Sequence, residues 1–183
     1  MSFFERNIEG NTLMVADTDW LRERYNTYES ALKALSPSRR DKALSYKFDK
    51  DQELSVLASV LLNWLLRRRG LREKDMTYAV SDLGKPSFIE RPDLYFSIAH
   101  SAKMAAVILG SAPVGADVEY LPDFPRDLAN PFMWTEMECV GKLLGHGVGC
   151  YVDGKKFDKP DDVKTKHIPF GDYLLCAAWK TKL

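Results

Sequence analysis

Polar residues recur with a helical period in one long apolar segment, residues 51–69. Ser55, Ser59, Asn63 and Arg67 lie four residues apart, and the positions between them are mostly Leu, Val and Ala. A narrow polar stripe on an otherwise apolar helix is typical of a helix packed on most of its sides. We therefore predict a long, largely buried helix over these residues.

Shorter patterned segments precede this helix. Residues 11–17 read as the first strand, residues 21–36 as a helix, and residues 36–48 as a further helix that starts at a Ser-Pro pair. The last of these carries cations in its first turns: Arg39, Arg40 and Lys42. Positive charges at a helix N-terminus oppose the helix dipole. An anionic ligand would make their position favourable.

Residues 94–119 change to short apolar runs separated by turn residues. The runs are LYFSIA, MAAVILG and PVGADVEY, joined at HSAK and GSAP. Apolar runs of this length with tight turns between them indicate strands. We predict a three-stranded antiparallel meander.

The same order occurs again after a proline-rich connector. The segment FMWTEMECVGKLLG reads as a helix with Asn130 as N-cap, Pro131 at its first position and Gly145 at its C-terminal end. GCYVDG (149–154), DVKTKHIPF and YLLCAAWK then read as strands.

Two segments, 51–119 and 131–179, therefore repeat the order helix then meander. We predict an α+β fold of two similar helix-plus-antiparallel-meander halves packed as a pseudo-dimer. The N-terminal half is residues 1–119 and the C-terminal half is residues 120–183.

The composition excludes several classes of protein. Lys plus Arg equals Asp plus Glu at 26 each in 183 residues, so no overall positive field marks a nucleic-acid binder. The most apolar stretch is too short for a bilayer span. The three cysteines show no CxxC spacing, which suits a reducing compartment and argues against zinc. We expect a cytoplasmic protein with neither nucleic-acid nor membrane partners.

Two acids, Asp117 and Glu119, lie one residue apart on a predicted strand. Their side chains point to the same face, and their repulsion is unfavourable unless water, a base or a cation offsets it. They form either a solvent-facing strand end or part of a metal site. Glu138, on the predicted helix that starts at Pro131, would be a third ligand. Glu138 and Lys142 are four residues apart, however, and also suit an ordinary salt bridge.

Four segments together resemble the 4′-phosphopantetheinyl transferases, in particular a short variant of the surfactin-synthetase-activating type. Their order and rough spacing match the pattern of that family, and the basic segment 35–53 resembles its N-terminal region. The segments are GKPSF (84–88), FSIAHS (96–101), VGADVE (114–119) and WTEMECVGK (134–142).

The resemblance implies the phosphopantetheinyl transferase fold and a reaction. A carrier-protein serine would attack the β-phosphorus of coenzyme A, and 3′,5′-ADP would leave. Magnesium would be held by Asp117, Glu119 and Glu138, an all-oxygen site of the kind that Mg²⁺ prefers. Glu138 or a metal-bound water would be the base.

The resemblance also implies contacts to the coenzyme. Lys85 and the catalytic Lys142 would hold the pyrophosphate, and His100, beside Ser101, would contact phosphate. Arg39 and Lys42 would bind the 3′-phosphate. The partners would be coenzyme A and an apo acyl or peptidyl carrier protein, and we expect a monomer.

The chain departs from the family pattern at several places, two of which bear on its activity. Met137 replaces a lysine, and the connector 120–133 is shorter than usual. These departures keep an alternative open, a weakened or non-catalytic module that binds coenzyme A or a nucleotide. A metal-dependent phosphohydrolase using the three acids is a further alternative.

Overall fold

The computed structural model describes residues 3–125, 130–147 and 157–181. Helices and strands follow one another in separate runs along the chain, as expected for an α+β fold. In chain order they are β1 (Phe3–Ile8), β2 (Asn11–Asp17), α1 (Thr18–Tyr25), α2 (Tyr28–Lys33), α3 (Pro37–Leu44), α4 (Asp49–Arg68), β3 (Tyr78–Val80), β4 (Pro86–Phe88), β5 (Tyr95–Ser101), β6 (Met104–Gly110), β7 (Val114–Tyr120), α5 (Pro131–Leu144), β8 (Val163–Phe170) and β9 (Tyr173–Lys180). Short 3₁₀ turns lie at Glu73–Asp75 and Leu121–Asp123.

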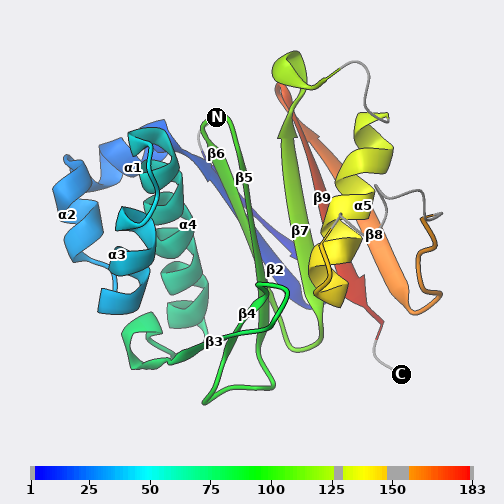
Figure 1. The fold of residues 1–183 in the computed structure, drawn as a ribbon, viewed down its shortest axis with the longest axis horizontal. Helices are drawn as coiled ribbons and strands as arrows, with labels where there is room; N and C mark the ends of the chain where they lie inside the picture. Colours follow the sequence, from blue (N-terminus) through cyan, green and yellow to red (C-terminus); the bar gives the residue numbers. More distant parts are fainter. Residues whose placement is uncertain (1–2, 126–129, 148–156, 182–183) are drawn as a thin grey trace.

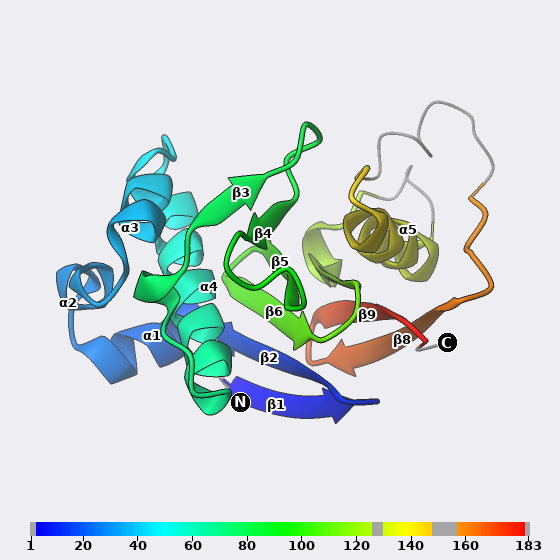
Figure 2. The ribbon, with the colours of Figure 1, turned by 90° about the horizontal axis from the view of Figure 1, so that it is seen from below.

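Two antiparallel sheets lie face to face between helices (Figure 1). The first has the strand order β1-β2-β6-β5, and the second has the order β7-β9-β8. Helices α1 to α4 cover the outer face of the first sheet, and α5 covers the outer face of the second (Figure 1). The strands β3 and β4 form a small separate pair that lies between α4 and α5 (Figure 2).

The alternation of side chains along β2 explains why the first sheet is buried on both faces. Met14 and Ala16 belong to the apolar cluster shared with α4, whereas Leu13 and Val15 belong to the cluster between the two sheets. Successive residues of a strand point to opposite faces. The strand therefore contributes to two cores at once.

The predicted long helix is confirmed as α4, which begins at Asp49 and ends at Arg68. Two residues of its polar stripe, Ser55 and Ser59, are buried. Ser59 satisfies its hydroxyl by donating to the Ser55 carbonyl oxygen at 2.7 Å and by accepting from Arg39 Nε at 2.9 Å.

The predicted ends of α5 are also confirmed. The Asn130 side chain accepts a hydrogen bond from the backbone N–H of Phe132 at 2.9 Å, and Pro131 is the first helical residue. Gly145 follows the helix with φ = 87°, in the left-handed region that favours glycine.

The single helix predicted over residues 21–36 is wrong, because the chain forms α1 and α2 there. Asn26 has φ = 57°, which breaks the helical path. Each helix then has its own cap, since Asp17 accepts from Trp20 N and Thr27 accepts from Ser30 N. The sequence reading also missed β1, which precedes the strand predicted to be the first.

The predicted three-strand meander is wrong in its last strand. β5 and β6 pair, but β7 forms its hydrogen bonds with β9 of the other sheet. Nearly all of β7 thus lies before the predicted boundary at residue 120, but β7 pairs with a strand after that boundary. The α+β class is confirmed, whereas a pseudo-dimer of two similar halves remains a prediction. The strand predicted over 149–154 lies outside the described residues.

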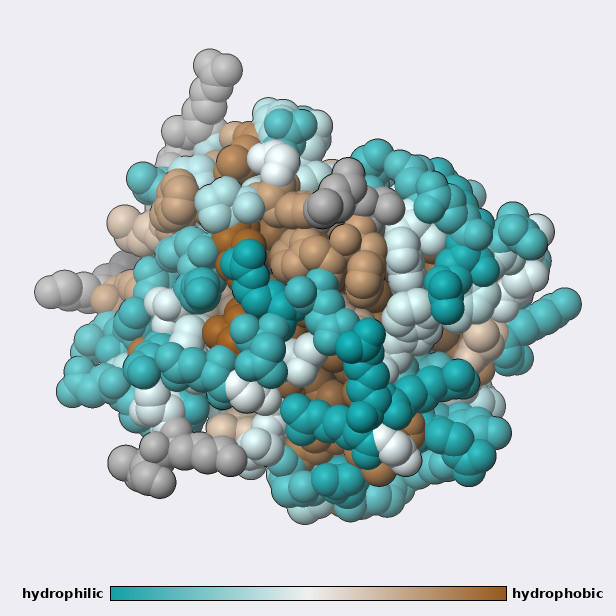
Figure 3. All heavy atoms as spheres, turned by 180° about the vertical axis from the view of Figure 1, so that it is seen from behind, coloured by the Kyte–Doolittle hydropathy of each residue, from teal (hydrophilic) through white to brown (hydrophobic). Residues whose placement is uncertain are grey.

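The surface seen from behind is mainly hydrophilic, with apolar side chains gathered near the middle of that face (Figure 3). Within the described residues, the helices are all too short or too polar to cross a membrane.

Candidate functional site

Strand β7 and helix α5 approach each other closely at Gly115. A Cβ added to Gly115 would lie 1.9 Å from the Cys139 carbonyl oxygen and 2.9 Å from the Leu143 backbone nitrogen. Real side chains do not tolerate such distances, so only glycine permits this contact. The close contact brings the acidic residues of β7 under the side chains of α5.

Lys142 bridges two of the acids predicted from the sequence. Its ammonium lies 2.6 Å from Asp117 Oδ1 and 3.1 Å from Glu138 Oε2. Asp117 is only 3% exposed. Its other oxygen, Oδ2, is buried without a hydrogen-bond partner among the residues that the structure describes. The expected ordinary pair, Glu138–Lys142, is thus part of a larger cluster.

Burial and charge oppose each other in this cluster. Burial raises the pKa of Asp117 to about 7, the Lys142 ammonium opposes this rise, and the Glu138 charge adds to it. Burial would lower the pKa of Lys142, but Asp117 and Glu138 outweigh it, and the pKa is raised. The ammonium is therefore stabilised in its charged form by the two acids.

The third acid, Glu119, is held from two sides. Its Oε1 accepts from the indole N–H of Trp134 at 3.1 Å, and its Oε2 accepts from the Ser101 hydroxyl at 3.4 Å. The Ser101 hydroxyl oxygen also accepts from the Tyr120 backbone N–H. Partial burial raises the pKa of Glu119. Ser101 thus reaches the acids, as a member of the same cluster.

His100 lies near the same charges. Loss of hydration lowers the pKa of its imidazole, the Lys142 charge acts in the same direction, and the Asp51 charge opposes both. The end of β5 therefore places His100 close enough to Lys142 to be affected by its charge.

The donor set fits a hard divalent cation. As the side chains stand, no three metal-ligating groups of the described residues come together as a ready metal site, and Lys142 contacts two of the acids. The three carboxylates nevertheless act electrostatically on one another, and the buried Oδ2 of Asp117 has no hydrogen-bond partner among the described residues. Carboxylate oxygens are the ligands that Mg²⁺ prefers. Asp117, Glu119 and Glu138 are the residues that would hold it.

A pocket of about 230 Å³ adjoins the cluster and contains both predicted phosphate-binding lysines, Lys85 and Lys142, in its wall. A larger cleft of about 530 Å³ shares part of this wall, and its lining is mainly apolar. The side chains that line the larger cleft include Leu83, Pro86, Tyr95, Phe96, Leu143 and Leu144.

Lys85 connects the loop between β3 and β4 to the end of α5. Its ammonium donates a hydrogen bond to the Leu143 carbonyl oxygen. Burial lowers the pKa of Lys85 to about 8. The sequence reading expected this lysine to contact phosphate and missed its contact with the C-terminal end of α5.

The structure places Arg39 and Lys42 on α3, on the opposite side of the two sheets from α5 (Figure 1). Arg39 is buried, donates to Ser59, and lies 5.6 Å from the centre of the Tyr78 ring. Lys42 is exposed, 4.9 Å from the Tyr46 ring. Within the described part of the chain, neither side chain forms a hydrogen bond or ion pair with the three acids, and their role at a phosphate remains a prediction.

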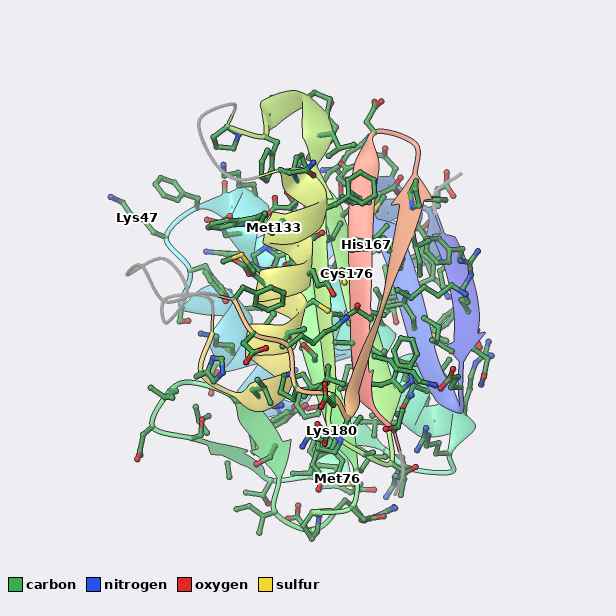
Figure 4. The ribbon with its side chains drawn as sticks, turned by 90° about the vertical axis from the view of Figure 1, so that its right-hand side faces the viewer. Lys47, Met76, Met133, His167, Cys176 and Lys180 are labelled. Carbon is green, nitrogen blue, oxygen red and sulfur yellow. The ribbon has the colours of Figure 1, made fainter. Side chains whose placement is uncertain are left out.

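Sequence reasoning also missed the thiols behind α5. Cys176 of β9 is in register with Asp117 of β7 on one side and with His167 of β8 on the other. Figure 4 shows Cys176 and His167 on adjacent strands beside α5. Cys139 of α5 and Cys176 are both buried. Cross-strand register, which decides this arrangement, is not visible in the residue pattern.

Comparison with known proteins gives a consistent result. No model of a protein family matches the chain. The chain is 27% identical to the 4′-phosphopantetheinyl transferase Sfp of Bacillus subtilis (strain 168) over 105 residues, which are 57% of this chain and 47% of that protein. It is 30% identical to the 4′-phosphopantetheinyl transferase pptA of Paxillus involutus over 92 residues, 48% of this chain and 35% of that protein.

A 4′-phosphopantetheinyl transferase of Bacillus subtilis is 26% identical over 100 residues. The matched regions span less than half the length of each of these three relatives. All three carry the same activity in their names, and the motifs of this chain meet in one cluster beside a pocket. Over about half of its length, the chain is related to proteins named as 4′-phosphopantetheinyl transferases.

Proposed function

We propose that this protein transfers the 4′-phosphopantetheine group from coenzyme A to a serine of an apo acyl or peptidyl carrier protein. The observation that carries the proposal is the arrangement of Asp117, Glu138 and Lys142 beside a pocket that also contains Lys85. Two lysines on the wall of one pocket suit a pyrophosphate, because phosphate groups require cations and hydrogen-bond donors.

The reaction breaks one bond of the pyrophosphate and forms one ester bond. The serine Oγ attacks the β-phosphorus of coenzyme A and forms a new P–O bond. The bond from that phosphorus to the bridging oxygen breaks, and 3′,5′-ADP leaves with the bridging oxygen. The serine proton passes to a base. Such chemistry depends mainly on positioning and on cations that stabilise charge on the phosphoryl oxygens.

Each residue of the cluster has a role in this proposal. Glu138, which is 21% exposed in its side chain, is the acid able to accept the serine proton at the protein surface. Trp134 and Ser101 orient Glu119 through its two oxygens. Bound Mg²⁺ would supply Lewis-acid stabilisation of the phosphoryl oxygens. Lys142 and Lys85 would hold the pyrophosphate from two different elements.

Met137 favours a second candidate, a weakened or non-catalytic protein that binds coenzyme A. The pattern of the family that this chain resembles has lysine at this position. Met137 is 8% exposed, so its side chain contributes to the packing under α5 and supplies no charge to the pocket. Loss of one cation would weaken phosphate binding, and it would leave the three acids in place.

Intact mass spectrometry of an apo carrier protein tests the proposal. The carrier is incubated with this protein, coenzyme A and Mg²⁺, and parallel samples omit each component. The proposal predicts a carrier heavier by one phosphopantetheine group only in the complete mixture, together with 3′,5′-ADP. An unmodified carrier despite measurable coenzyme A binding would support the second candidate. Cleaved coenzyme A with an unmodified carrier would indicate a phosphohydrolase.

A further inference from the structure

We propose that Lys142 is an exchangeable internal cation of the acid cluster. In the ligand-free protein it neutralises Asp117 and Glu138, and it leaves Asp117 when a divalent cation and a phosphate-bearing ligand arrive. The inference rests on the proposed function and goes further, because it predicts that the metal ion and the coenzyme bind cooperatively through one named side chain.

The contacts of Lys142 are those that a metal ion would need. Its ammonium lies within 2.6 Å of an oxygen on β7 and 3.1 Å of an oxygen on α5. A divalent cation bound by Asp117 and Glu138 would compete for the same two carboxylates. Two cations this close would repel each other. Metal binding to the ligand-free protein therefore works against the existing ion pairs.

The Lys142 side chain also lines a pocket in which it could contact another anion. Its side chain is 30% exposed and lines the pocket of about 230 Å³, together with Lys85. A phosphate in this pocket would give the ammonium a new anionic partner. The side chain can then turn by rotation about its own bonds, while α5 stays fixed against Gly115.

The buried position of Asp117 makes the exchange strongly coupled. A buried carboxylate without a cation is costly, so Asp117 requires either the ammonium or a metal ion. A phosphate that attracts Lys142 leaves Asp117 free for the metal. A metal on Asp117 leaves Lys142 free for the phosphate. Coupling between two ligands is typically about 5- to 150-fold in affinity and acts equally in both directions.

Calorimetric titration with Mn²⁺ alone tests the exchange. Mn²⁺ suits carboxylate ligands. The wild type is compared with Lys142→Met, which keeps the apolar stem and removes the competing charge. We expect Lys142→Met to bind Mn²⁺ at least ~10-fold more tightly than the wild type, within the usual range of coupling. Equal or weaker binding by the variant would overturn the proposal.

Lys159→Met is the matched control, because Lys159 pairs with Glu136 of α5 at 2.8 Å and, among the described residues, forms no hydrogen bond or ion pair with the three acids. Its Mn²⁺ affinity should equal that of the wild type, and a similar gain in both variants would overturn the assignment to Lys142. Circular dichroism checks the fold of each protein. If Lys142→Met does not fold, Lys142→Gln replaces it with a polar, uncharged side chain, and the same comparison applies.

A second titration measures the coupling itself. The affinity for coenzyme A is measured with and without saturating Mn²⁺, in the wild type and in Lys142→Met. The gain due to Mn²⁺ should be smaller in the variant, and an equal gain would contradict the exchange. These experiments contain no carrier protein. If the transfer reaction fails, these titrations can still test the exchange. If the exchange is wrong, the transfer assay can still test the proposed function.

Discussion

A carboxylate as buried as that of Asp117 loses most of its hydration, and its charge then depends on a neighbouring cation. Lys142 supplies that cation at 2.6 Å. The pair lies at the contact between β7 and α5, so the same two residues stabilise the packing and define the candidate site. Side chains next to this pair divide into those that face the acids and those that pack inward.

Met137 belongs to the second group, and its substitution by lysine tests this. Met137 is 8% exposed. We expect Met137→Lys to cost at least ~2 kcal/mol, because an ammonium at a buried position lacks hydration. This corresponds to a decrease of about 4–8 °C in melting temperature for a protein of this size. Thermal unfolding measures it. An unchanged melting temperature with tighter coenzyme A binding would mean that the lysine reaches the pocket.

Arg39 and Lys42 should respond differently to substitution by alanine. Arg39 is buried and donates to Ser59, and loss of such a charge-assisted hydrogen bond costs about 1.5–3 kcal/mol. Arg39→Ala should therefore lower the melting temperature. Lys42 is exposed, so Lys42→Ala should keep stability and weaken binding of coenzyme A more than that of dephospho-coenzyme A. Equal weakening of the two ligands would show that Lys42 does not bind the 3′-phosphate.

The lowered pKa of Lys85 predicts a pH dependence of ligand binding. Burial lowers this pKa to about 8. Below pH 8 the side chain is a charged ammonium that attracts phosphate, and above pH 8 it becomes neutral. We expect the affinity for 3′,5′-ADP to fall as pH rises from 7 through 9.

The variant Lys85→Arg serves as the comparison for that titration. Arginine stays charged over this range. Its affinity should therefore change less with pH than that of the wild type. Parallel pH curves for the two proteins would assign the titration to another group.

At the scale of elements, the contact between β7 and α5 is set by one glycine. A Cβ at position 115 would lie 1.9 Å from the backbone of Cys139, so Gly115→Ala must push the helix away from the strand. Overpacking of this kind costs about 1–3 kcal/mol. We expect a lower melting temperature together with weaker Mn²⁺ binding, since the ligands lie on both elements. Retention of wild-type values in both measurements would show that α5 can shift without affecting the site.

Local patterns predicted the elements well where one segment contains the whole signal. The polar stripe of α4 and the caps of α5 depend on neighbouring residues only. Strand pairing depends on distant segments. The turn after β6 is compatible with a hairpin, yet β7 joins β9, which lies more than fifty residues later. Most of β7 is buried on both faces, which favours a position between two layers of the fold. No residue close to β7 in the sequence determines which strand it pairs with.

The residues of the candidate site were proposed from the sequence, whereas only some of their contacts could be. The family resemblance of VGADVE and WTEMECVGK implied that three acids and Lys142 lie near one another. The contact partner of each side chain was not predictable, because it depends on which oxygen that side chain reaches. Lys142 contacts Asp117, and Trp134 donates to Glu119. Both contacts cross from α5 to β7, so they require the close approach at Gly115.

At the scale of the whole molecule, the site lies where several parts of the fold meet. The end of β5 provides His100 and Ser101, the loop before β4 provides Lys85, β7 provides two acids, and α5 provides Glu138 and Lys142. Apolar clusters pack against the faces of the two sheets. Dense packing of this kind holds side chains in place, which the proposed transfer requires.

The most direct test of the central claim compares the transfer rate of Glu138→Gln with that of Glu136→Gln. Glu138 belongs to the acid cluster, whereas Glu136 of the same helix accepts hydrogen bonds from Lys159 and Thr165. The rate of holo-carrier formation is measured by mass spectrometry at saturating coenzyme A and Mg²⁺. We expect Glu138→Gln to lower the rate by at least ~100-fold, the usual order for a positioned base or metal ligand. Glu136→Gln should stay close to the wild type. A Glu138→Gln protein as active as the wild type would contradict the account.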